Sequence, residues 1–184
     1  MRSIRCLVLL LLLSGVLSAA DRVVKVDPSR SYVDVDVKAT ADSFTARLEA
    51  YELRVVVDEK ERVKTVTLDF KFSDLKTGKA ERDAGMIDWL GGASPAGRFE
   101  LGLLALTPSG QGHVSGNLTF HGHTSLVEFP VGIERAEGDF IITGTATIDY
   151  RRWGLKVYRK LGVLKVDPEV KIRFKFAGRP EEVK

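Results

Sequence analysis

The sequence is nearly free of cysteine and carries little net charge. Its one cysteine, Cys6, lies in an N-terminal stretch that we expect to be removed, so the rest of the chain can form no disulfide. The chain has 28 Lys and Arg residues against 25 Asp and Glu residues, and the two signs are interspersed along it. No basic stripe of the kind that binds nucleic acid is present. These absences exclude a disulfide-stapled fold and argue against a nucleic-acid partner.

Long apolar runs are also rare, and the longest one, residues 7–13, lies near the N-terminus. Arg2 and Arg5 precede it, and Ser18-Ala19-Ala20 follows with the small side chains that a signal peptidase recognises. The run is shorter than the roughly 20 apolar residues that a membrane-spanning helix needs. We therefore predict a signal peptide over residues 1–20, no membrane span in the mature chain, and a periplasmic or secreted location.

Residues 21–184 form the predicted mature domain, and most of them alternate between apolar and polar side chains, which is typical of half-buried β-strands. The pattern is clearest over residues 114–133, where two alternating arms flank His121-Gly122-His123-Thr124, and Gly122 can adopt the positive φ of a hairpin turn. Similar strands are predicted over residues 33–37, 48–57, 66–72, 99–105, 140–148 and 170–176. About eight strands separated by turn residues favour an all-β sandwich or barrel.

Residues 77–90 lack this alternation and predict one short helix near residues 79–89, ended by Gly91-Gly92. Its later part carries an apolar cluster, Met86, Ile87, Trp89 and Leu90. We interpret this cluster either as a plug for one end of the barrel or as the lining of a cavity mouth, and both can hold at once.

Histidine is scarce, and His121 and His123 are the main candidates for catalysis or metal binding, because alternate residues of a strand share a face. His113 is expected near the far end of the same strand, so no third ligand is apparent nearby. Ser125 could join His121 in a Ser-His-Asp arrangement, but no Gly-x-Ser-x-Gly motif is present. A polar turn is the plainer interpretation, and we predict no catalytic residue, metal or other cofactor.

Two glycines on the predicted inward face suggest room inside a barrel. An eight-stranded barrel is just wide enough for packed side chains or one small ligand. Gly116 and Gly144 would leave space beside Leu118, Phe120 and Ile142, although a glycine can equally mark a bend in a sheet. An apolar lumen would favour an extended apolar ligand, since burying each methylene is worth ~0.8 kcal/mol.

Several motifs, in the same order along the chain, resemble the YceI-like family of small secreted and periplasmic β-barrels. Val26–Ser31 resembles the family's opening D-P-x-H-S, with Arg30 where histidine is common. Thr77–Asp83 resembles T-G-N-x-x-R-D, and Gly116–Thr124 resembles G-x-L-T-I-H-G-V-T. Further matches are Asp88-Trp89-Leu90, Pro95 with Phe99, Arg152-Trp153-Gly154-Leu155 and Val170-Lys171-Ile172. The resemblance covers nearly all of the mature chain.

The resemblance implies a lipocalin-like antiparallel barrel whose elongated lumen carries or stores a polyisoprenoid or another long-chain lipid, such as a fatty acyl chain, without catalysis. Met86, Trp89, Trp153 and Leu155 are then expected to line one end. The expected ligand-binding wall consists of Leu68, Phe70, Phe72, Leu101, Leu103, Leu118, Phe120, Phe129, Val131, Ile142, Ile148, Phe174 and Phe176.

Two alternatives stay open on the sequence alone. The first is a structural or protein-interaction barrel with a packed interior, which is compatible with a homodimer and with a protein partner of unknown kind. The second is a hydrolase or metal enzyme that uses His121 and His123.

Overall fold

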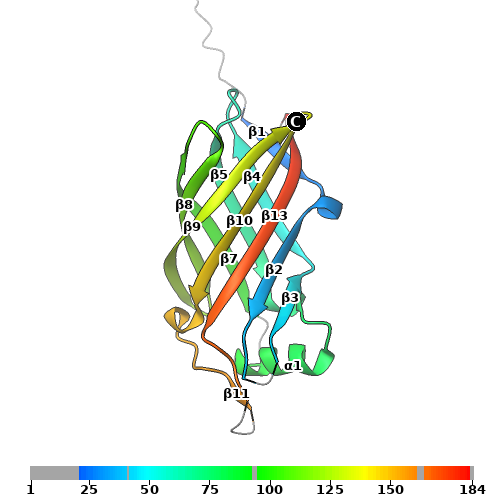
Figure 1. Cartoon of the computed structure of the whole chain (residues 1–184), viewed down its shortest axis with the longest axis vertical. Helices are drawn as coiled ribbons and strands as arrows, with labels where there is room; N and C mark the ends of the chain where they lie inside the picture. Colours follow the sequence, from blue (N-terminus) through cyan, green and yellow to red (C-terminus); the bar gives the residue numbers. More distant parts are fainter. Residues whose placement is uncertain (1–20, 41, 93–94, 161–163, 183–184) are drawn as a thin grey trace, which may run out of the picture.

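The computed structural model describes residues 21–40, 42–92, 95–160 and 164–182 and shows a closed antiparallel β-barrel (Figure 1). The predicted signal peptide, residues 1–20, lies outside the described residues. Pairing between β1 and β13 closes a ring of eight strands. In spatial order these are β1 (Arg22–Val26), β4 (Tyr51–Val57), β5 (Val63–Lys71), β7 (Ala96–Leu106), β8 (Gln111–Phe120), β9 (His123–Ala136), β10 (Asp139–Asp149) and β13 (Glu169–Glu182).

Near one end of the barrel, the strands next to β13 change. A 3-10 turn, η1 (Pro28–Arg30), separates β1 from β2 (Tyr32–Val37), and both strands pair with β13, at different heights. β3 (Phe44–Leu48) then pairs with β2, and β6 (Leu75–Lys76) pairs with β3. The pairs β1–β2 and β3–β4 therefore act as two kinked strands of one wall.

The prediction of one uninterrupted strand from residue 48 to residue 57 is wrong at its start. β3 ends at Leu48 and β4 begins at Tyr51. Between them, the backbone N–H of Glu49 donates to the carbonyl of Asp74 at 2.9 Å, outside the β4–β5 ladder. The sequence pattern continues across this kink because alternation reports which face a residue occupies and not which strand it pairs with.

The predicted β8–β9 hairpin is confirmed. Its ladder runs from the pair Gln111–Gly132 to the pair Phe120–His123. The two turn residues, His121 and Gly122, have φ values of 50° and 74°, and positive φ at both central residues is what the favoured type I′ turn requires.

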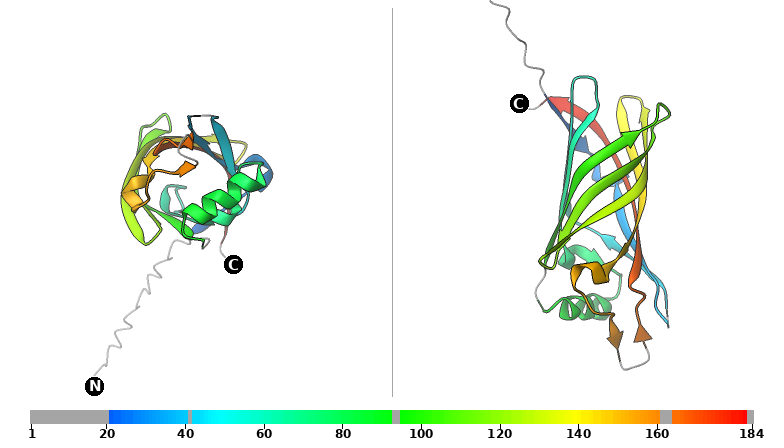
Figure 2. Two further views of the ribbon diagram at one scale, coloured as in Figure 1. Left: turned by 90° about the horizontal axis from the view of Figure 1, so that it is seen from below. Right: turned by 90° about the vertical axis from the view of Figure 1, so that its left-hand side faces the viewer.

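The predicted helix is confirmed as α1 (Ala80–Trp89), and it lies across the lower end of the barrel (Figure 2). Asp83 accepts hydrogen bonds from both the backbone N–H and the hydroxyl of Thr77, at 2.9 and 2.6 Å, which fixes the chain as it enters the helix. Two more 3-10 turns, η2 (Phe72–Asp74) and η3 (Tyr150–Trp153), and a small hairpin of β11 (Arg159–Lys160) and β12 (Leu164–Lys165) complete this end. Among the described residues, no helix combines the length and apolar character needed to span a bilayer.

Charged side chains form a ladder on the outer face of β3, β2 and β13. Arg47 holds the buried carboxylate of Asp34 with two hydrogen bonds of 2.8 and 3.0 Å. Arg173 binds Asp36 in the same two-pronged way at 2.6 and 3.0 Å, and these bonds hold the pKa of Asp36 below its ordinary value. Successive side chains of a strand point to opposite faces. The β2 residues that alternate with Asp34 and Asp36 therefore point into the barrel, and they are apolar.

Candidate ligand-binding cavity

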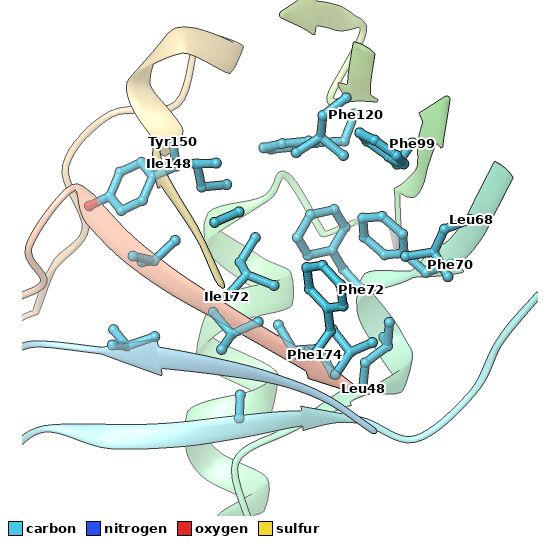
Figure 3. Close-up of a pocket in the computed structure, with 18 of the residues that line it drawn as sticks. Leu48, Leu68, Phe70, Phe72, Phe99, Phe120, Ile148, Tyr150, Ile172 and Phe174 are labelled. Carbon is cyan, nitrogen blue, oxygen red and sulfur yellow. The ribbon is translucent and has the colours of Figure 1, made fainter. Parts of the chain in front are cut away.

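The barrel encloses a cavity of about 510 Å³ (Figure 3). Inward side chains of the wall strands line it, such as Val114 and Leu118 on β8 and Phe129 and Val131 on β9. This volume lies within the roughly 300–1,000 Å³ of typical small-molecule sites. The interior is therefore hollow, and its wall is hydrocarbon over most of its length.

Aromatic rings form a large part of the wall. The rings of Phe99, Phe129, Phe174 and Phe176 succeed one another with centroid separations of 5.9, 5.7 and 5.4 Å. Figure 3 shows the rings of Phe70, Phe72 and Phe174 gathered in one part of the cavity. Such surfaces bind flexible hydrocarbon through dispersion and the exclusion of water, with little dependence on hydrogen bonding.

The expectation that Gly116 and Gly144 leave empty space is wrong. A Cβ at Gly116 would lie 2.5 Å from the ring of Phe99, and a Cβ at Gly144 would collide with the ring of Phe174. Each ring thus lies against the bare backbone of a glycine on the neighbouring strand. The glycines let the rings lie close to the wall, which keeps the middle of the lumen open.

The polar residues of the lining gather at the lower end, where the cavity meets α1. They are Asp42, Thr77, Lys79, Glu81, Arg82, Tyr150 and Tyr158. Arg82 pairs with Asp42 at 3.2 Å, and its guanidinium lies 3.9 Å from the centre of the Phe44 ring. Arg82 therefore fastens the first half of α1 to the β2–β3 connection.

Trp89 fastens the second half of α1. Its indole N–H donates to the carbonyl of Lys156 at 2.9 Å, and its ring meets the edges of Tyr150 and Tyr158 at 5.0 and 6.0 Å. Burial beside these groups raises the pKa of Tyr150 above its ordinary value. The hydroxyl of Tyr150 also donates to the carbonyl of Val166 at 3.3 Å, so its polar atom is satisfied beside the apolar cavity.

The upper end of the cavity is closed by packed side chains. Val24, Val55, Val57 and Phe140 form a cluster in which each residue is at most 3% exposed. Arg135 lies over Phe140 at 4.6 Å and pairs with Glu61. The cavity therefore has one sealed end and one end covered by a helix.

The structure places most of the residues predicted to bind a ligand around the cavity. These are Leu68, Phe70, Phe72, Met86, Trp89, Leu101, Leu118, Phe120, Phe129, Val131, Ile142, Ile148, Leu155, Phe174 and Phe176. Their contact with a ligand stays a prediction.

Leu103 is wrongly assigned to the lumen, because it lies on the outer face of β7 and is 63% exposed. A β-bulge shifts the β7–β8 register between Leu101 and Leu103, so that Leu104 faces inward in its place. A bulge inserts one residue and so reverses the alternation beyond it. Gly102 at this point is the one signal in the sequence, since glycine inside a strand often marks a bulge.

Trp153 is also wrongly assigned, because it packs behind the cavity wall and does not line the cavity. It is fully buried, stacks on Phe120 at 4.7 Å and donates its indole N–H to the carbonyl of Leu118 at 2.8 Å. Trp153 therefore belongs to the main core cluster and supports the ring of Phe120 beside the cavity.

The sequence did not predict two parts of the cavity lining. These are the inward residues of β2 and β3 and the polar residues at the lower end, which we call the mouth. Val33, Val35 and Val37 line the cavity, and their alternation had already predicted a strand. Arg82 and Asp42 pair although they are 40 positions apart, and no local sequence pattern predicts this contact.

His121 in the β8–β9 turn and His123, the first residue of β9, lie outside the cavity lining. Their ring centres are 6.2 Å apart, and Nδ1 of His121 lies 3.1 Å from the carbonyl oxygen of Trp153. Within the described ranges, no group of three or more His, Cys, Asp or Glu side chains is placed to hold a metal ion. The turn thus offers one side-chain hydrogen bond, which joins His121 to η3.

A closed antiparallel barrel with a hollow apolar interior and a helix over one end defines a lipocalin-like class of protein. The family model of the YceI-like domain matches residues 24–177, and the chain belongs to this family. A search of curated proteins finds no match.

Solved structures show the same fold at low sequence identity. Burkholderia cenocepacia BcnA has a TM-score of 0.71 and 16% identity, over 84% of this chain and 99% of that one. A polyisoprenoid-binding domain from Saccharophagus degradans, implicated in plant cell wall breakdown, has a TM-score of 0.66 and 16% identity, over 90% and 99%. The Campylobacter jejuni YCEI protein has a TM-score of 0.62 and 13% identity, over 79% and 88%.

Proposed function

We propose that this protein binds an elongated apolar lipid, a polyisoprenoid or a fatty acyl chain, in the barrel lumen and carries or stores it without chemical change. The observation that carries the proposal is the cavity of about 510 Å³, whose wall is hydrocarbon except at the helix end. Each methylene that leaves water for such a wall is worth ~0.8 kcal/mol, so a long chain gains affinity with length.

The relatives support the same class of ligand. The Saccharophagus degradans structure is that of a polyisoprenoid-binding domain, and it shares the barrel with this chain. The polar groups at the mouth would meet the head of the lipid while the wall holds its chain. The hollow interior counts against the alternative of a packed interaction barrel, because that barrel would keep no cavity.

The proposal also places the protein outside the cytoplasm. We propose that residues 1–20 act as a signal peptide and that the mature chain works in the periplasm or after secretion. A carrier in an aqueous compartment would shield its lipid from water. This location is testable by fractionation together with N-terminal sequencing, and an uncut N-terminus in the cytoplasmic fraction would contradict it.

A pair of arginine substitutions on one strand tests the lumen directly. Leu118 lines the cavity on β8, whereas its neighbour Asn117 is exposed on the outer face. We expect Leu118→Arg to abolish displacement of a fluorescent prenyl probe, because the guanidinium cannot be paired in an apolar wall. Asn117→Arg should bind like the wild type.

The two variants also separate binding from folding. Circular dichroism and melting temperatures identify a folded Leu118→Arg protein, and only that protein is informative. Unaltered uptake by folded Leu118→Arg would overturn the lumen as the binding site.

A further inference from the structure

A second, smaller cavity of about 300 Å³ lies beside α1, between this helix and the segment formed by η2 and β6. We call it the α1–β6 groove. Most of its lining is apolar or small: Phe72, Leu75, Ala80, Ala84, Met86 and Ile87, together with Ser73, Lys76 and Asp83. The groove thus offers hydrocarbon surface outside the main lumen.

Three side chains line both the groove and the main cavity. Phe72, Leu75 and Met86 belong to the two linings at once, so side chains and not backbone separate the two spaces. All three are only partly buried. Met86 is unbranched and adapts its shape readily, so it can move aside at low cost.

Among the described residues, the β5–β7 ladder of the barrel wall also ends at this place. Pairing between β5 and β7 stops at Lys71 and Ala96, followed by one hydrogen bond of 3.2 Å from Phe72 N–H to the Pro95 carbonyl. The chain then turns through η2 into β6. In the part of the chain that the structure describes, β6 pairs with β3 and makes no ladder with β7. α1 lies across this end of the barrel (Figure 2).

We infer that the α1–β6 groove is a side portal for an apolar chain too long for the main lumen: because the upper end is sealed, the surplus tail folds back toward the helix end and leaves there. The inference rests on the proposed function and extends it, because it gives the protein a way to bind long chains of different lengths. The occupant is uncharged hydrocarbon and not a head group. Of the two charged groups in the lining, Asp83 is already bound by Thr77 through two hydrogen bonds, and Lys76 can hold its ammonium in water while its methylenes stay on the groove wall.

Ala84 allows a test that leaves the main lumen untouched. Its side chain is exposed and lines the groove but not the main cavity. Ala84→Trp would fill the groove, and Ala84→Ser is the matched control, because Trp and Ser have similar helix propensities. Binding of geranylgeraniol and of the longer prenyl alcohol solanesol would be measured for the wild type and both variants.

The expected result is selective for chain length. Each methylene forced back into water lowers affinity on the order of fourfold. Ala84→Trp should therefore weaken solanesol at least about tenfold and leave geranylgeraniol within about twofold, while Ala84→Ser changes neither. Equal solanesol affinity in Ala84→Trp and Ala84→Ser, or an equal loss for both alcohols, would overturn the portal. A wild type that binds neither alcohol would overturn the proposed function itself, and the portal with it.

Photo-crosslinking provides a second measurement on the unmodified protein. Solanesol with a diazirine at its tail end should label the groove residues Lys76, Ala84 and Ile87. Labelling confined to the upper end of the lumen, around Val55 and Phe140, would show that the whole chain is held inside and would overturn the portal.

Discussion

The two ends of the barrel close the same cavity by different means. At the upper end, Val24, Val55, Val57 and Phe140 interlock and are each at most 3% exposed. At the lower end lies α1, and none of its ten residues is buried. A few side-chain contacts hold it, chiefly those of Arg82 and Trp89.

From this difference we expect stability and ligand exchange to depend on opposite ends of the barrel. The packed side chains form a seal that opens only on unfolding, because separating buried apolar side chains costs several kcal/mol of free energy. A helix fastened by surface contacts can open locally at much lower cost. We therefore expect the sealed end to hold the fold and the helix end to admit a ligand.

The largest effect is expected at the sealed end. Phe140→Ala should lower the free energy of unfolding by about 3–5 kcal/mol, because it removes a buried ring and leaves a cavity. Thr143→Ala, at an exposed position of the same strand, is the control and should change it by less than about 0.5 kcal/mol. Urea denaturation of the two variants measures both values. A loss below about 1 kcal/mol for Phe140→Ala would show that the upper cluster is not the seal.

A smaller effect is expected on ligand release from the helix end. Arg82→Ala removes one exposed ion pair and one cation–π contact, together worth on the order of 1 kcal/mol, so release of a prenyl probe should accelerate about fivefold. Stopped-flow transfer of the probe to excess lipid vesicles gives the rate.

Arg135 provides the matched control for Arg82. It makes the same two kinds of contact at the sealed end, an ion pair with Glu61 and a cation–π contact with Phe140. Arg135→Ala should leave the release rate within about twofold of the wild type. Faster release from Arg135→Ala than from Arg82→Ala would reverse the assignment of the two ends.

The smallest effect concerns acid stability near the sealed end. Hydrogen bonds from Arg30 and Arg179 hold the pKa of Asp139 below its ordinary value of 3.8. A carboxylate with a lowered folded-state pKa stabilises the protein above its ordinary pKa, and this stabilisation is lost as the pH falls through the folded-state value.

The acid effect is checked by melting temperature against pH. The wild type should lose stability below about pH 4, and Asp139→Asn should show a shallower decline there, because it lacks one titrating group. If melting temperature falls equally with pH in the two proteins, Asp139 does not contribute to the loss of stability in acid.

The sequence predicts the barrel well because alternation of apolar and polar residues shows, within each strand, which side chains face inward and which face outward. The alternation of residues 114–133 and the glycine between its two arms suffice to predict the β8–β9 hairpin. The structure narrows the expected connection, residues 121–124, to the two-residue turn that sets the register. The prediction fails where a local irregularity changes the count. The bulge at Gly102 turns Leu103 outward, and the break after Leu48 divides one expected strand into two.

The site is predicted less completely because its ends are built from distant segments. Alternation predicts the wall residues. Trp153 is a large aromatic residue of the kind that lines apolar cavities, but it stacks against Phe120 and does not line the cavity. The fastening of Arg82 to Asp42, and the shared lining of the groove and the lumen around Met86, depend on how α1 sits over the barrel. Only the assembled fold shows these contacts.

Native mass spectrometry of the mature protein, purified from its own host without detergent, would show whether the barrel carries a lipid. Solvent extraction and lipid analysis of the same sample would follow. The account predicts a stoichiometric mass adduct that extracts as one prenyl or acyl lipid. A clean apo mass, with no change in melting temperature when such lipids are added, would contradict the account and favour a barrel that binds a protein partner.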